Sequence, residues 1–103
     1  MRIKILTDNI DSSESLQEMI DEKLASGLDE LLTNYEEEIK EATVHVEKRT
    51  RWGYKVNFDM WLPGKKHIFA EETGDELLNV VVALREKLET QIREYTDKVQ
   101  GNW

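Results

Sequence analysis

The stretch YKVNFDMWLPGKKHIFAE, residues 54–71, decides the fold. From its first residue to Leu62, every second residue is apolar or aromatic, which is the two-residue period of a strand that buries one face. Pro63 presets φ and Gly64 accepts a positive φ, so this pair predicts a tight turn. Residues 65–71 predict a second strand, which forms a hairpin with the first. The residues expected to face the core are Tyr54, Val56, Phe58, Met60, Leu62, Ile68 and Ala70.

Two further strands are predicted on the N-terminal side of this hairpin. Residues 42–47, ATVHVE, alternate in the same way, and residues 2–7, RIKILT, place charged and apolar side chains on opposite faces. Residues 48–53, KRTRWG, are predicted to form a basic hairpin loop between two neighbouring strands. The inward residues of the two additional strands are Ile3, Ile5, Ala42, Val44 and Val46.

Two amphipathic helices are predicted, because apolar residues recur at steps of three and four. The first runs to about Leu32, and its preferred cap is Ser13, whose side-chain oxygen can accept from the amides of the first turn. Ser12 is nearly as good a cap. The second begins with a capping box formed by Thr73 and Glu76, and Gly101 can end it. The first stripe contains Leu16, Met19, Ile20, Leu24, Leu28, Leu31 and Leu32, and the second contains Leu77, Val81, Leu84, Leu88, Ile92, Tyr95 and Val99.

The predicted fold is a single α+β domain over residues 1–103 with the element order β-α-β-β-β-α. A four-stranded mixed sheet with both helices packed on one face would bury both apolar stripes. Because the first connection contains a helix, the first two strands are expected to be parallel, with a right-handed crossover. The other face of the sheet then stays exposed and carries His45, Asn57, Asp59, Trp61, His67 and Phe69.

On this exposed face, Trp61 and Phe69 are candidates for cross-strand neighbours. Three interpretations of such a pair stay open. It can be a stacking platform for single-stranded RNA, a pair that stabilises an open sheet, or a patch that contacts protein.

The composition argues against an enzyme, a metal site and a membrane span. The chain has no cysteine, which excludes disulfides, thiol nucleophiles and thiolate metal sites. Two histidines, expected at the surface on non-adjacent strands, make a poor structural metal site, and there is no glycine-rich phosphate loop. No apolar run approaches the roughly 20 residues that span a bilayer. We therefore expect a cytoplasmic protein that is not an enzyme and needs no cofactor or metal.

Charge is distributed unevenly along the chain, whose formal net charge is −8. Residues 1–41 contain 12 acidic and 4 basic residues, whereas residues 42–103 contain 10 of each. Within residues 48–67 there are six basic residues and one acidic residue. An acidic total argues against nucleic-acid binding, but a local basic patch favours it. The sequence thus predicts an acidic first third and a basic middle.

Several short segments are similar to those of one protein family. Residues 13–16, SESL, resemble a Thr-Glu-x-Leu start of the first helix, and residues 44–48, VHVEK, resemble a second strand that ends Val-Glu-Lys. Residues 70–74, AEETG, resemble the approach to the second helix, in which residues 87–92, KLETQI, resemble Lys-Leu-x-x-Gln-Leu. The order of elements matches as well. The sequence therefore resembles the hibernation-promoting factor and ribosome-associated inhibitor A family (sigma-54 modulation protein / S30EA-like), in its short form.

The resemblance implies a translation inhibitor that binds the small ribosomal subunit in the decoding region and acts in ribosome hibernation under stress. The implied partners are 16S rRNA and ribosomal proteins, without DNA or a membrane, and a weak homodimer stays open. The residues that the resemblance and the local charge single out for rRNA binding are Lys23, Lys48, Arg49, Arg51, Lys65, Lys66, Lys87, Gln91, Arg93 and Lys98. The candidates for base stacking or protein contact are Trp52, Trp61 and Phe69.

The acidic first helix supports a second hypothesis. Phosphate contacts depend on Lys and Arg, so an acidic, diverged member could act as a protein-interaction module without strong rRNA binding. Structural explanations of the basic candidates also stay open. The loop at residues 48–53 can be a solvated hairpin, Lys65 and Lys66 can belong to a solvated turn, and Lys87 can pair with nearby glutamates.

Overall fold

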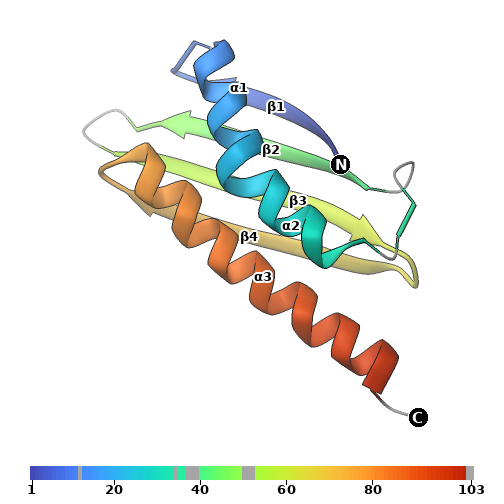
Figure 1. Cartoon of the computed structure of the whole chain (residues 1–103). Helices are drawn as coiled ribbons and strands as arrows, with labels where there is room; N and C mark the ends of the chain where they lie inside the picture. The colour runs from blue at the N-terminus through green and yellow to red at the C-terminus, as the bar shows by residue number, and fades with distance from the viewer. Residues whose placement is uncertain (12, 34, 37–39, 50–52, 102–103) are drawn as a thin grey trace.

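The computed structural model describes residues 1–11, 13–33, 35–36, 40–49 and 53–101. It has one four-stranded sheet, with the helices on a single face of it (Figure 1). The strands, which lie side by side in chain order, are β1 (Arg2–Asp8), β2 (Glu41–Lys48), β3 (Tyr54–Leu62) and β4 (Lys66–Gly74). The helical segments are α1 (Glu14–Ile20), η1 (Asp21–Ala25), α2 (Ser26–Leu31) and α3 (Leu77–Gly101). The predicted fold class and element order are confirmed.

The sheet is mixed, as predicted. β1 pairs with β2 in parallel, whereas the β2–β3 and β3–β4 pairs are antiparallel. In this register Val44 lies opposite Phe58, and Phe58 lies opposite Ala70. All three belong to the buried core. Because successive side chains of a strand point to opposite faces, the residues between them form the open face of the sheet.

The first helical region begins where the sequence predicts. The Ser13 side chain accepts a hydrogen bond from the Leu16 N–H (3.1 Å), which satisfies an amide of the first turn. The innermost residues of this helical region recur at steps of four. In an ideal α-helix, each step of four residues turns the position of the side chain by about 40° around the helix axis, so such a stripe drifts away from the core. The sequence predicts one regular helix, but the structure inserts the π-helical segment η1, whose wider turn counters this drift. The stripe stays buried at Leu16, Ile20, Leu24, Leu28 and Leu32.

The start of the second predicted helix needs a correction, because Thr73 does not cap it. Thr73 belongs to β4, where it lies opposite Lys55. α3 begins after Glu76, whose carbonyl accepts a hydrogen bond from the Val80 N–H (3.0 Å). Threonine suits both a helix cap and a strand. The hairpin pairing with β3 therefore decides in favour of the strand.

Close contacts join the helices to each other and to the sheet. At Gly27 of α2, an added Cβ would lie 3.2 Å from the Cδ of Arg85 on α3, so the two helices approach closely there. Arg85 also donates to the carbonyl of Lys23 on η1 (3.3 Å). Lys40, just before β2, is buried, and its ammonium lies 2.7 Å from the Asp29 carboxylate of α2.

Candidate functional site

The basic candidates do not form one patch, because the structure places them at two ends of the sheet. Lys48 ends β2 and Arg49 follows it, whereas Lys65 and Lys66 lie in and just after the turn at the other end of β3 (Figure 1). β3 has 9 residues, so about 27 Å of strand separates the two groups. The other two candidates of the first group, Arg51 and Trp52, lie outside the described residues.

The two described ends of the β2–β3 loop are joined by a backbone hydrogen bond, and Gly53 lies close to the end of β4. The Arg49 N–H donates to the carbonyl of Gly53 (3.1 Å). Gly53 has a φ of 89°, and a Cβ there would lie 2.7 Å from the carbonyl oxygen of Gly74. The side chains of Lys48 and Arg49 are both exposed. This end of the sheet therefore presents two cations that can contact phosphates.

The β3–β4 turn at the opposite end is also fixed in position. Gly64 and Lys65 both have positive φ, 82° and 61°. The Tyr95 hydroxyl of α3 donates to the carbonyl of Pro63 (2.6 Å), which ties the turn to the helix. Lys65 and the next residue, Lys66, are exposed. The second end of the sheet thus presents two cations on a well-supported turn.

Lys87 and Gln91 of α3 lie along the free edge of β4. The Gln91 amide donates to the Phe69 carbonyl (2.7 Å) and accepts from the Phe69 N–H (3.3 Å). The Lys87 ammonium donates to the carbonyl of Glu71 (3.2 Å) and lies 3.1 Å from the carboxylate of Glu72. An edge strand otherwise leaves such backbone groups unpaired. Both side chains therefore have a structural role, and their RNA contacts stay predictions.

The other basic candidates are distributed along the helical segments. Lys23 is an exposed residue of η1. Arg93 is exposed on α3, and its guanidinium lies 3.5 Å from the Glu89 carboxylate, which partly compensates its charge. Lys98 lies further along the same helix. Their predicted rRNA contacts remain predictions.

The open face carries an aromatic cluster on β3 and β4. Trp61 lies opposite His67, and their rings are stacked with centroids 4.4 Å apart and planes at 13°. The His67 Nε2 lies 2.7 Å from Oδ1 of Asp59. Trp61 and Phe69 lie on adjacent strands, as predicted, but they are diagonal neighbours and not a directly opposed pair, because Phe69 lies opposite Asp59. The turn fixes the register of the hairpin. In this register His67, the first residue of β4 that faces the open side of the sheet, lies against the indole of Trp61.

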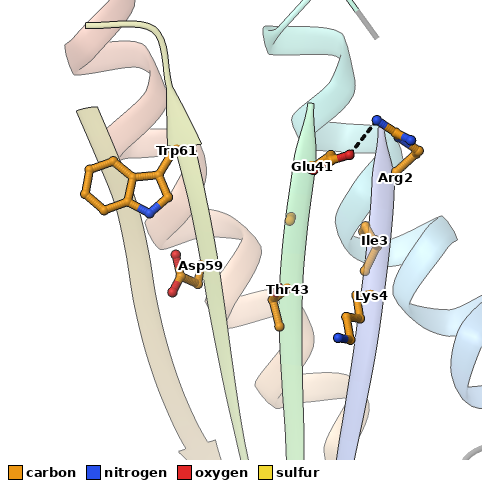
Figure 2. A pocket seen from close by; sticks show the side chains of 8 residues that line it. Arg2, Ile3, Lys4, Glu41, Thr43, Asp59 and Trp61 are labelled. Atoms are coloured by element: carbon orange, nitrogen blue, oxygen red, sulfur yellow. Dashed lines mark ion pairs between the residues drawn. The ribbon is translucent and has the colours of Figure 1, made fainter. Parts of the chain in front are cut away.

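A shallow hollow of about 570 Å³ lies on the open face beside Trp61 (Figure 2). Its floor includes the short side chain of Thr43 on β2, with Lys4 on the neighbouring β1. At one end, Arg2 and Glu41 form an ion pair between β1 and β2. The indole of Trp61 leans over β4, away from Lys4 (Figure 2). The hollow therefore has charges of both signs and is bordered by an aromatic residue.

Metal and membrane features can be assessed within the residues that the structure describes. Among them, no group of three or more His, Asp or Glu residues is placed to hold a metal ion. His45 lies on β2 and His67 on β4, which are non-adjacent strands, as predicted. In the same part of the chain, no helix is long and apolar enough to cross a membrane.

Two of the polar contacts that were not predicted from the sequence lie outside the basic candidates. One is the ion pair of the buried Lys40 with the partly exposed Asp29, for which the sequence gives no periodic signal. The other is the contact of Tyr95 with the β3–β4 turn. The Tyr95 hydroxyl also lies near the hydroxyl of Tyr35. Burial, as the larger cause, and the Tyr95 hydroxyl, as the smaller one, raise the pKa of Tyr35 above its ordinary value. A tyrosine on an apolar stripe is itself a usable signal, because its hydroxyl needs a partner when buried.

The fold and the site define a small open-faced α+β domain with exposed cations at both ends of the sheet. The chain belongs to the family described as Sigma 54 modulation protein / S30EA ribosomal protein, whose model matches residues 3–100. A ribosome hibernation promotion factor of Staphylococcus aureus is 26% identical over 100 residues, which cover 96% of this chain and 50% of that protein. The chain thus spans about half the length of this curated relative.

Two solved structures have the same fold. The N-terminal domain of Thermus thermophilus Protein Y matches with a TM-score of 0.73 and 22% identity, over 92% of this chain and 99% of that one. A ribosomal subunit interface protein from Coxiella burnetii matches with a TM-score of 0.69 and 24% identity, over 93% and 98% of the two chains. At this level of identity, the two structures support the fold.

Proposed function

We propose that this protein is a ribosome-associated translation inhibitor that binds the small subunit in the decoding region. The observation that carries the proposal is the family match over residues 3–100. The curated relative is named for ribosome hibernation, and one structural neighbour is named a ribosomal subunit interface protein. The exposed cations at both ends of the sheet supply the chemistry that phosphate binding needs.

Inhibition of this kind needs no reaction at the site. A folded domain that occupies the decoding region excludes messenger and transfer RNA by its volume. Lys48 and Arg49 lie about 27 Å from Lys65 and Lys66 along β3, so the two ends can contact phosphates of separate RNA segments. We place this activity in the cytoplasm, with rRNA and ribosomal proteins of the small subunit as the partners.

Co-sedimentation with purified small subunits tests the proposal. The protein should pellet with the subunits at low salt and be released as salt rises, because cation–phosphate contacts displace counterions. The same preparation should lower the yield of a cell-free translation reaction and compete with messenger RNA for the subunit. Absence of pelleting at every salt concentration, with folded protein, would contradict the proposal.

The alternative function, a protein-interaction module, is favoured by one observation. The solvent side of the first helical region carries exposed acidic residues along its length, and these repel phosphates. A pull-down that recovers a specific basic protein without rRNA would favour this alternative, whereas rRNA as the main product would count against it. The acidic residues of this surface are Glu14, Glu18, Asp21, Glu22 and Glu30.

A further inference from the structure

The end of the β3–β4 hairpin, residues 61–67 and here called the hairpin tip, combines an exposed aromatic ring with two cations. The side chain of Trp61 is 58% exposed although it stacks on His67. The Asp59 carboxylate, 2.7 Å from Nε2 of His67, holds the imidazole in place. The indole is therefore supported by the imidazole on one side and open to solvent on the other. A further planar ring can stack on its open side.

The charge of the hairpin tip is positive. Residues 61–67 include Lys65 and Lys66 and no acidic residue. Both lysines are exposed, and neither makes an ion pair with the residues that the structure describes. On the open face, the Asp59 carboxylate is engaged with the imidazole and Glu41 with Arg2. On the helix side, Glu94 of α3 lines the same hollow as Lys66 and forms no ion pair with it. The two ammonium groups are thus available to an anionic partner.

The backbone of the hairpin tip is held in one conformation. Two successive residues, Gly64 and Lys65, are in the left-handed region, with φ of 82° and 61°. A lysine in this region is strained. The Tyr95 hydroxyl fastens the preceding Pro63 carbonyl to α3 at 2.6 Å. The indole and the backbone that carries the lysines are therefore presented without a large ordering cost on binding.

We propose that the hairpin tip binds an unpaired nucleotide of RNA, whose base stacks on the open side of Trp61 while Lys65 of the turn contacts a neighbouring phosphate. Lys66, which lies on the helix side of β4 beside Glu94, would contact the RNA backbone where it continues around the tip. Aromatic stacking combined with cations on the backbone is how proteins hold single-stranded nucleic acid, without base preference. Lysine is depleted at protein–protein interface cores, so the same surface is less suited to a protein partner. This inference rests on the proposed function, because the ribosome would supply the nucleotide.

A fluorescence titration with free RNA tests the hairpin tip alone. The variant Trp52→Phe/Trp103→Phe leaves Trp61 as the single tryptophan of the chain, and unstructured oligouridylate is the probe. Stacking should quench its emission in a saturable, salt-sensitive way. In that background Lys65→Ala/Lys66→Ala should weaken binding several-fold, by about 5-fold or more. Lys55→Ala, which removes a cation near the other end of β3, should change it less than 2-fold. Absence of quenching, or equal effects of the lysine variants, would overturn the proposal.

A co-sedimentation arm connects the hairpin tip to the ribosome. Trp61→Ala should weaken binding to small subunits by about 10-fold, and Trp61→Phe should restore most of it, because one stacked base is worth this much. Leu78→Ala removes a similarly exposed apolar side chain from α3 and is the control. If Trp61→Ala pellets as well as the wild-type protein does, the proposal for the hairpin tip is overturned and the proposed function stays intact.

If the wild-type protein never pellets, the proposed function is overturned, and the fluorescence titration then decides whether the hairpin tip binds RNA. Loss of pelleting in Trp61→Ala without quenching by RNA would indicate a protein partner and overturn the RNA proposal.

Discussion

Gly53 and Gly64 both have a left-handed backbone, with φ of 89° and 82°, but they differ in what surrounds them. At Gly64 an added Cβ would be 3.7 Å from the Tyr95 hydroxyl, an ordinary contact. Gly64→Ala should therefore cost only the backbone strain, about 1 kcal/mol. At Gly53 the same Cβ would lie 2.7 Å from the Gly74 carbonyl oxygen. Gly53→Ala should cost clearly more, about 2–4 kcal/mol, because strain and overlap combine.

Urea denaturation of the two glycine variants under the same conditions measures this difference. The midpoint should fall further for Gly53→Ala than for Gly64→Ala, with similar slopes. Equal losses would show that the β2–β3 loop can move away from β4, and that the close approach of the two backbones does not restrict it.

The ion pair of Asp29 and Lys40 is a second test of a single contact. Lys40 is buried and Asp29 is partly exposed. Asp29→Ala removes the carboxylate that lies 2.7 Å from the ammonium, and should lower the free energy of unfolding by about 2 kcal/mol, after allowance for solvent screening. Lys40→Met keeps the aliphatic stem and removes the charge, so it should cost less. In a double-mutant cycle, Lys40→Met should recover part of the stability that Asp29→Ala loses. A fully additive result would contradict a coupled pair.

Among the elements, the junction of α3 and β4 gives the sharpest prediction. The Gln91 amide needs both its donor and its acceptor to bond the Phe69 carbonyl and N–H. Gln91→Ala should cost about 1 kcal/mol, and Gln91→Glu should cost at least as much, because a carboxylate cannot donate and repels the carbonyl. Thr90→Ala is the control, since the Thr90 hydroxyl donates to the Glu86 carbonyl of the same helix and to no other described residue. Faster hydrogen exchange of the Phe69 amide should accompany the loss. Equal effects of the Gln91 and Thr90 variants would contradict the edge role.

The elements also show how far the sequence leads. The strands and the Ser13 cap were predictable, because one-sided burial imposes a period of two and a first turn leaves amides to satisfy. The π-helical segment was not predictable. A pattern of apolar residues at steps of three and four fits a regular helix, and it does not show how far the stripe rotates over several turns. Exposed lysines at the turns were predictable from composition. The contacts of Lys87 and Gln91 with β4 were not, because their partners lie 16 and 22 positions away in the chain.

Across the whole molecule, the charge is arranged against a general attraction to RNA. The formal net charge is −8, and the solvent side of the first helical region carries exposed acidic residues. Four exposed cations, Lys48, Arg49, Lys65 and Lys66, are instead placed at the two ends of the sheet. Docking the acidic side of the first helical region against RNA phosphates is electrostatically unfavourable. The two ends of the sheet, which carry cations, can approach the phosphates. Binding should then depend on where the cations are, rather than on the total charge.

The salt dependence of small-subunit binding tests this arrangement. The magnitude of the negative slope of log K against log salt should fall by about 1–2 in each of two variants, Lys48→Ala/Arg49→Ala and Lys65→Ala/Lys66→Ala. Each phosphate contact contributes about 0.7–0.9 to that magnitude. Because the pairs are about 27 Å apart along β3, their losses of binding free energy should add. Lys4→Ala/Lys55→Ala removes the same charge from the strands between the ends, where Lys55 pairs with Glu71, and should leave the slope nearly unchanged. If this control lowers the slope as much as either end pair does, net charge governs binding and the two-ended arrangement does not.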